Sequence, residues 1–140
     1  MSLMPDLQDR LAIQDLFARY AAALDNGDVE TVVACFTPDA VLESPAIGRI
    51  SGIVALRDFA RRFAEWRAAG TQFRHMITNI AAEIDGDRAR TTAYLLVPIT
   101  RGGETRTLPP GRYECDLVKT GGAWRFSRRA VFHDAPYTLD

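Results

Sequence analysis

The sequence has no long apolar run and no large excess of charge of either sign. It contains no stretch of roughly 18 apolar residues that could span a bilayer, so we expect no membrane partner. The formal net charge of −1 argues against a nucleic-acid partner, because nucleic-acid-binding domains usually carry a basic face. The first residues, MSLMPDLQDR, lack the basic and apolar segments of a secretion signal. The default expectation is therefore a cytoplasmic protein.

Residues that bind metals or cofactors are equally scarce. The chain has two histidines, His75 and His133, and two cysteines, Cys35 and Cys115, and their spacing fits no zinc motif. The apolar surroundings of the cysteines favour buried free thiols. The sequence also lacks GxSxG, a phosphate-binding loop, GxGxxG and HExxH, which mark common nucleophilic, nucleotide-binding and zinc enzymes. We therefore expect neither a metal nor a cofactor.

The first half of the chain has the periodicity of helices. With 140 residues, 47% of them hydrophobic, the chain can form one domain around one core. Apolar residues at helical spacing predict a helix over Asp6–Asp25. The segment DNGD separates it from a second helix over Val29–Phe36, which a proline closes. A short strand at about Val41–Glu43 and a turn region then lead to a third helix over Val54–Ala69.

The second half reads as antiparallel sheet. Four strands are predicted, separated by glycine-containing turns and one longer polar connection: Phe73–Ile84, Ala89–Ile99, Arg112–Thr120 and Ala123–Asp134. Three helices followed by a meander of long strands is an α+β pattern, with the helices on one side of the sheet. Such a sheet curves, and the resulting cone is open at one end. That mouth is where we expect a pocket for a small molecule.

His75 is the most informative polar residue in these strands. We expect it on one strand face with Ile77 and Asn79. A histidine held by a carboxylate is a good general base, because the carboxylate keeps one ring nitrogen protonated and stabilises the imidazolium. The candidate carboxylate is Asp25, at the end of the first helix, where the helix dipole disfavours a negative charge by roughly 0.3–1 kcal/mol. The alternatives are a structural histidine and an ordinary turn aspartate.

Two further side chains could assist a base. Tyr20 lies on the apolar stripe of the first helix and could donate a hydrogen bond to a substrate or pack in the core. It is ~140° from Asp25 around an ideal helix. Both therefore reach one cavity only if the last turn unwinds or the pocket wraps the helix end. Arg129, in the alternating segment WRFSRRAVFHD, could hold a leaving group or an anionic intermediate. The alternative is an exposed strand arginine.

The order of these parts resembles the SnoaL-like domain of the NTF2-like superfamily. The likeness rests on AIQDLFARYAAALDNGDVETVVACFTPDAV, RHMITNI, GDRART and GRYECDLVKTGGAWRFSRRAV, and it extends from about Leu7 to His133. The resemblance implies a single SnoaL-like domain over residues 1–140, with a cone-shaped α+β barrel. It also implies a homo-oligomer, a dimer or trimer, that packs through its sheet.

Within that superfamily the chain looks most like the group of scytalone dehydratase, bile-acid 7α-dehydratase and hexachlorocyclohexane dehydrochlorinase. These enzymes share an Asp–His dyad, and Asp25 and His75 fall on its two positions. Tyr20 falls on a tyrosine of the bile-acid enzyme, and Arg129 falls on an arginine of the dehydrochlorinase. Scytalone dehydratase has a second histidine on the following strand, where this chain has none. Its particular substrate is therefore not indicated.

The resemblance thus implies a cofactor-independent lyase of the dehydratase or dehydrohalogenase kind, or an isomerase. His75 would take a proton from carbon and Asp25 would orient it, while Tyr20 and Arg129 would assist the leaving group or an enolate. The expected substrate is a small, largely apolar, cyclic molecule. Residues available to line the cone are Phe17, Leu24, Phe59, Phe63, Leu95 and Val97. The alternatives are a non-catalytic ligand-binding or accessory domain, like the β-subunits of ring dioxygenases, and a polyketide cyclase.

Overall fold

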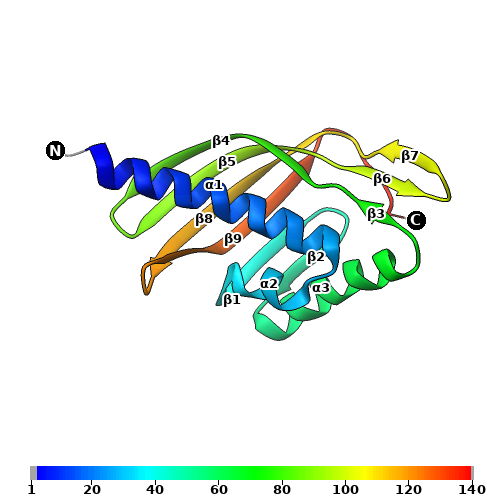
Figure 1. The fold of residues 1–140 in the computed structure, drawn as a ribbon, viewed down its shortest axis with the longest axis horizontal. Coiled ribbons are helices and arrows are strands. Elements are labelled where there is room, and N and C mark those ends of the chain that lie inside the picture. The colour runs from blue at the N-terminus through cyan, green and yellow to red at the C-terminus, as the bar shows by residue number, and fades with distance from the viewer. Residues whose placement is uncertain (1–2, 140) are drawn as a thin grey trace.

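The computed structural model describes residues 3–139 and shows helices packed on one face of a curved sheet. The three helices are α1 (Leu3–Asn26), α2 (Val29–Ala34) and α3 (Ile53–Ala68). In Figure 1, α1 runs across the sheet, and α2 and α3 lie near its C-terminal end. No helix in the described part of the chain is long and apolar enough to cross a bilayer. The predicted α+β class and its helical layer are confirmed.

The main sheet has six strands in the order β2-β1-β9-β8-β5-β4. Their bounds are β1 Phe36–Ser44, β2 Gly48–Ser51, β4 Met76–Asp85, β5 Arg88–Leu96, β8 Gly111–Thr120 and β9 Ala123–His133. A second sheet has the order β3-β6-β7, with β3 Gln72–Phe73, β6 Pro98–Arg101 and β7 Glu104–Thr107. We expected an antiparallel sheet. All strand pairs of the main sheet are antiparallel except β1 with β9, which are parallel, so this sheet is mixed.

The boundary between α2 and β1 differs from the prediction. We expected the second helix to reach Phe36 and a strand to begin only near Val41, but α2 ends at Ala34 and β1 begins at Phe36. Phe36 pairs with Phe126 of β9, and the pairing register shifts before Val41. Pro38 is exposed within this irregular stretch, where its missing N–H does not interrupt a regular ladder. Pairing with a distant strand therefore overrides the local helical pattern.

Two predicted strands are each divided between the two sheets. The strand expected over Phe73–Ile84 breaks at Arg74 and His75, with β3 before the break and β4 after it. His75 therefore lies between two strands and not within one. It still lines one groove together with Ile77, as predicted, whereas Asn79 does not line that groove. Asn79 itself has φ 56° at a register shift in β4. The expected strand Ala89–Ile99 likewise becomes β5 and β6, and the polar connection after it contains β7.

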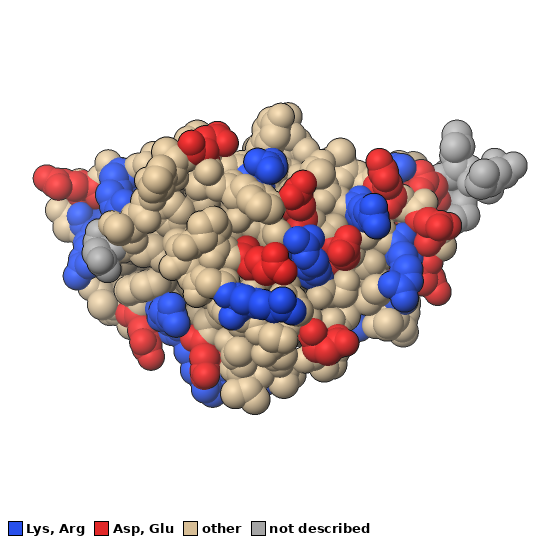
Figure 2. Space-filling model, turned by 180° about the vertical axis from the view of Figure 1, so that it is seen from behind, with Lys and Arg blue, Asp and Glu red and all other residues tan. Residues whose placement is uncertain are grey.

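The core lies between α1, α3 and the concave face of the sheet. Five side chains of α1 are at most 2% exposed: Ile13, Leu16, Phe17, Tyr20 and Leu24. Burying a large apolar side chain contributes roughly 1.5–3 kcal/mol each, so this face holds α1 firmly on the sheet. On the side opposite the view of Figure 1, acidic and basic side chains alternate and neither sign forms a continuous patch (Figure 2).

A polar contact fixes the first half of α1 to the hairpin of β8 and β9. The carboxylate of Asp9 accepts hydrogen bonds from Trp124 Nε1 at 3.0 Å and from Lys119 Nζ at 3.1 Å. The indole hydrogen bond, together with Lys119, lowers the pKa of Asp9 below its usual value although burial opposes this. Asp9 therefore couples the orientation of α1 to the sheet through a charge as well as through apolar packing.

We predict that Asp9→Asn lowers the free energy of unfolding by about 1 kcal/mol at neutral pH. This is less than the roughly 1.5–3 kcal/mol of a hydrogen bond to a charged group, because the amide oxygen can still accept from Trp124. A lowered carboxyl pKa contributes stability that is present above the ordinary Asp value near 3.9 and is lost as the pH falls below it. The difference between wild type and variant should therefore shrink in acid. Urea denaturation at neutral and acidic pH measures both effects.

Asp6→Asn is the matched control, because Asp6 lies on the same helix and forms an exposed ion pair with Arg10. That change should cost less than about 0.5 kcal/mol. Equal losses for the two variants, or a loss at Asp9 that does not change with pH, would contradict the role of the Asp9 charge.

Candidate functional site

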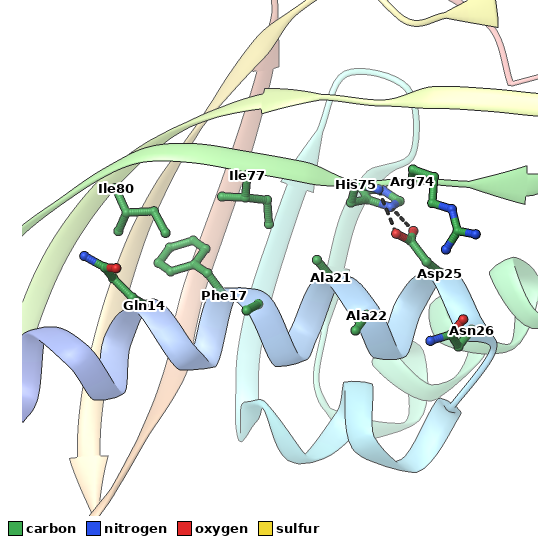
Figure 3. Close-up of a pocket in the computed structure, with 11 residues that line it drawn as sticks. Gln14, Phe17, Ala21, Ala22, Asp25, Asn26, Arg74, His75, Ile77 and Ile80 are labelled. Carbon is green, nitrogen blue, oxygen red and sulfur yellow. Dashed lines mark hydrogen bonds and ion pairs between the residues drawn. The ribbon is translucent and has the colours of Figure 1, made fainter. Parts of the chain in front are cut away.

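Asp25 and His75 meet where α1 ends. Asp25 Oδ1 lies 2.5 Å from His75 Nδ1, and Asp25 Oδ2 accepts the backbone N–H of His75 at 2.8 Å (Figure 3). Each side chain is only 8% exposed. Because a carboxylate only accepts, the neutral ring carries its proton on Nδ1. The arrangement leaves Nε2 as the ring nitrogen that can take a proton.

The segment around His75 is held by contacts on several sides. The backbone N–H of Arg74 donates to Pro98 O at 3.0 Å, where the chain passes between the two sheets. Gln72 Nε2 donates to Phe73 O at 2.8 Å and to Asp25 O at 3.3 Å, which links the end of α1 to this segment. The Phe73 ring stacks on the imidazole at 23°, and Phe63 meets it edge-on. Both the ring plane and the backbone of His75 are therefore fixed.

His75 also borders an internal cavity of about 40 Å³ with Tyr20 and Arg129. Five of the six residues predicted to line the cone do so: Leu24, Phe59, Phe63, Leu95 and Val97. Phe17 lines a groove outside the cavity instead, while its ring packs edge-on against Phe126 in the core. Part of the cavity wall comes from Tyr137 and Leu139, which follow the last strand. The wall is thus made by both layers and by the segment after β9.

The outer groove has a volume of about 520 Å³ and lies between α1 and β4 (Figure 3). Asp25 lines this groove but not the internal cavity, whereas His75 borders both. Since α1 stays helical to Asn26, its last turn does not unwind, and Tyr20 and Asp25 end up lining different spaces. Asp25 is therefore linked to the internal cavity only through the His75 ring.

Arg129 is buried, which excludes the alternative of an exposed strand arginine. Its exposed fraction is 5%, and its guanidinium carbon lies 4.7 Å from the ring centroids of both Tyr20 and Tyr113. The register between β8 and β9 shifts between Phe126 and Arg128, so Ser127 is a bulge residue. A bulge changes which residues alternate inward. Both Phe126 and Arg129 are therefore buried, although simple alternation placed them on opposite faces.

The polar atoms around Arg129 are incompletely paired. Within residues 3–139, Arg129 Nε and the Tyr20 hydroxyl are buried without a hydrogen-bond partner, and no carboxylate forms an ion pair with Arg129. Burial raises the pKa of Tyr20 well above its usual value and that of Tyr113 to about 12, although the positive charge of Arg129 opposes both shifts. Both phenols are thus neutral near pH 7, and Tyr20 retains an unused hydrogen-bond donor beside a cation.

Several residues that line the cavity were not predicted from the sequence, among them Tyr113 and His133. Tyr113 follows the inward alternation of β8, which the spacing of its buried residues would have indicated. His133 shares the inward phase of Arg129 after the bulge, so it would have followed from a correct placement of Arg129.

Neither Cys35 nor Cys115 lines the cavity or the groove. Both cysteines are buried and free, as expected, and burial raises the pKa of Cys115 to about 12. In the part of the chain that the structure describes, no three His, Cys, Asp or Glu side chains converge as a metal site would require.

Comparisons with known proteins agree with this architecture. An uncharacterised protein of Mycobacterium tuberculosis is 30% identical over 92% of this chain and 88% of its own length. The small subunit of anthranilate 1,2-dioxygenase from Burkholderia cepacia is 28% identical, covering 95% of this chain and 91% of the subunit.

Solved structures show the same fold. A Mycobacterium tuberculosis protein of unknown function superposes with a TM-score of 0.86 at 29% identity, covering 97% of this chain and 78% of that one. An NTF2-like protein with a cystatin-like fold from Novosphingobium aromaticivorans gives 0.84 at 20% identity, over 96% of this chain and 87% of that one. That second likeness concerns the fold alone. The SnoaL-like domain family matches residues 5–130, and the chain belongs to this family.

Proposed function

We propose that this protein is a lyase or isomerase that begins its reaction by removing a proton from carbon, with His75 as the base. The observation that carries this proposal is the buried pair of Asp25 and His75 at the wall of a cavity. The carboxylate is bonded to Nδ1, so a proton taken by Nε2 gives an imidazolium next to a fixed negative charge. Asp25 is thus the orienting and charge-stabilising residue.

Arg129 and Tyr20 are suited to the negative charge that develops when the proton leaves. Proton removal next to a carbonyl group moves charge onto its oxygen, as in an enolate, and preorganised donors at that oxygen lower the barrier. Arg129 is a buried cation without a carboxylate partner among the described residues, and Tyr20 has an unused hydroxyl beside it. An isolated buried charge is costly to the fold. A bound anion or enolate would supply the missing partner.

The substrate that fits this lining is small and mostly apolar, with one carbonyl-like group. The cavity wall is largely aliphatic and aromatic, and its polar groups are few and specific. At about 40 Å³ the cavity must widen before such a molecule can enter. Tyr137 and Leu139 form the part of the wall that belongs to neither helix nor sheet. Displacement of this segment is therefore the proposed route of entry.

A second candidate function is a non-catalytic accessory subunit. It is supported by the similarity to the small subunit of anthranilate 1,2-dioxygenase. An accessory scaffold has no need of a buried carboxylate bonded twice to one histidine, nor of a buried cation without a counter-ion. These features favour the catalytic proposal, and the two functions differ in whether the protein itself exchanges a carbon-bound proton.

We predict that the protein accelerates deuterium exchange at the α-carbons of 2-tetralone, an apolar cyclic ketone without a leaving group. His75→Gln should reduce the exchange rate about 10²-fold or more, because general-base catalysis contributes about that much. Asp25→Asn should reduce it as well, by removing the charge that stabilises the imidazolium. Exchange is followed by NMR in D₂O, and circular dichroism confirms that each variant is folded.

Asp15→Asn is the matched control, because Asp15 lies on the same helix with an exposed carboxylate. It should leave the exchange rate unchanged. If wild type binds 2-tetralone but does not exchange its protons, or if His75→Gln exchanges them at the wild-type rate, the accessory function is the better one.

We also predict that Arg129→Met makes the protein more stable but slows the exchange reaction. Methionine fills a similar volume without a charge, so the free energy of unfolding should rise by about 1 kcal/mol, as when other buried charges are replaced by apolar residues. The exchange rate should nevertheless fall, because the donor for the enolate oxygen is lost. Thermal and urea unfolding measure the first effect, and NMR exchange measures the second.

Arg129→Ala serves as the comparison, because it removes the charge but leaves a void, and it should be less stable than Arg129→Met. A methionine variant that is clearly less stable than wild type would mean that the cation stabilises the fold, contrary to the proposed functional role.

A further inference from the structure

We propose that His133 is a second acid–base group of the cavity, which protonates a departing hydroxyl group, so that the substrates are β-hydroxy carbonyl compounds. This inference rests on the proposed role of His75 as the base. It selects dehydration from the reactions that this base could start, and it assigns a residue that neither the sequence pattern nor the family likeness singles out.

The position of His133 supports this role. It is the last residue of β9 and lines the same cavity as His75, Tyr20 and Arg129. Its Nδ1 lies 2.8 Å from the carbonyl oxygen of Pro109, and a carbonyl can only accept. Nδ1 therefore carries a proton whether the ring is neutral or charged. Nε2 is the nitrogen left for a substrate. Only the charged ring carries a proton on Nε2 as well, so the imidazolium form is the acid in the proposed step.

The backbone around His133 is built to hold the ring in place. Pro109 and Pro110 present successive carbonyls, and Pro110 O accepts the backbone N–H of Asp134 at 2.8 Å. Gly111 pairs directly with His133, and a Cβ at Gly111 would lie only 2.4 Å from Phe132 O and 3.2 Å from His133 Nδ1. Only glycine permits this approach of the two strands. The imidazole is thus positioned by main-chain groups on the side opposite Nε2.

The chemistry of the leaving group explains why a second proton-transfer residue is useful. When the base breaks the C–H bond, its electrons form the C=C bond and the C–O bond breaks. Hydroxide leaves readily only as water, so the oxygen needs a proton, whereas a carboxylate or halide departs without one. Arg129 stays charged in proteins, and burial raises the pKa of Tyr20 and Tyr113, which weakens them as acids.

Imidazole is the side chain best matched to proton transfer near neutral pH. In the proposed step His133 gives its Nε2 proton to the departing oxygen and becomes neutral, while His75 becomes an imidazolium. Water is released, and the proton balance is restored when His75 loses its proton to solvent and His133 regains one. The hydrogen bond to Pro109 persists in both states of His133, because Nδ1 keeps its proton throughout.

The test compares two probes that share a reacting C–H bond and a product. 3-Hydroxycyclohexanone and 3-acetoxycyclohexanone both give cyclohex-2-enone, but only the first must lose a protonated oxygen. The main variant is His133→Asn, because the asparagine amide can still donate to Pro109 O while Nε2 is removed. We expect it to slow dehydration about 10²-fold, the scale of general-acid catalysis, and to change acetate elimination less than about threefold. Ultraviolet absorbance of the enone measures both rates.

Several outcomes decide the matter. If His133→Asn slows both eliminations equally, or neither, His133 has no role as an acid and the proposal is overturned. The same follows if wild type eliminates acetate but not hydroxide. His75→Gln tests the proposed base separately from the proposed acid. It should slow both eliminations, and if it slows neither, the assignment of His75 as the base is wrong whatever the result for His133. His133→Gln provides a second variant should the asparagine protein fail to fold. Asp15→Asn, which changes an exposed carboxylate outside the cavity, should leave both rates unchanged.

Discussion

The two hydrogen bonds that His75 donates to the Asp25 carboxylate are the contact on which the site depends. One oxygen holds the ring and the other holds the backbone N–H of the same residue, so a single carboxylate fixes both the tautomer and the path of the chain. This contact depends on the interruption between β3 and β4, where His75 lies, and on α1 ending beside that interruption. The donors at His75 also offset the unfavourable end of the α1 dipole. Fold and site thus share one constraint.

The two buried charges of the site differ in whether they have an ionic partner. The negative charge of Asp25 is paired with His75 and borders the outer groove, whereas the positive charge of Arg129 is buried among aromatic rings. Aromatic faces attract a cation, but they do not satisfy its N–H groups, and Nε has no partner within the described residues. A fold selected for stability alone would favour an apolar side chain at this position. In the proposed function, these unpaired donors would bind an oxygen atom of the substrate.

Periodic features of the fold were predictable from the sequence, and its irregular features were not. The spacing of apolar residues placed α1 and α3 within a few residues, because a helix face is encoded locally. The early start of β1 at Phe36 and the bulge at Ser127 depend on pairing between distant strands, which no local pattern records. The burial of Arg129 followed from that bulge. Asp25 and His75 were paired through a family likeness, since local spacing left their alternatives open.

The division of the site by α1 bears on the proposed roles of Asp25 and His75. Tyr20 and Asp25 lie on different sides of a helix that remains regular to its end, so one borders the internal cavity and the other borders the outer groove. His75 is the residue that borders both spaces. The carboxylate can therefore stabilise the imidazolium without presenting its own charge to an apolar substrate. A carboxylate inside the cavity would attract Arg129 and remove the unpaired cation. In the proposed mechanism, the position of Asp25 behind the ring keeps the base and the cation apart while both contact one substrate molecule.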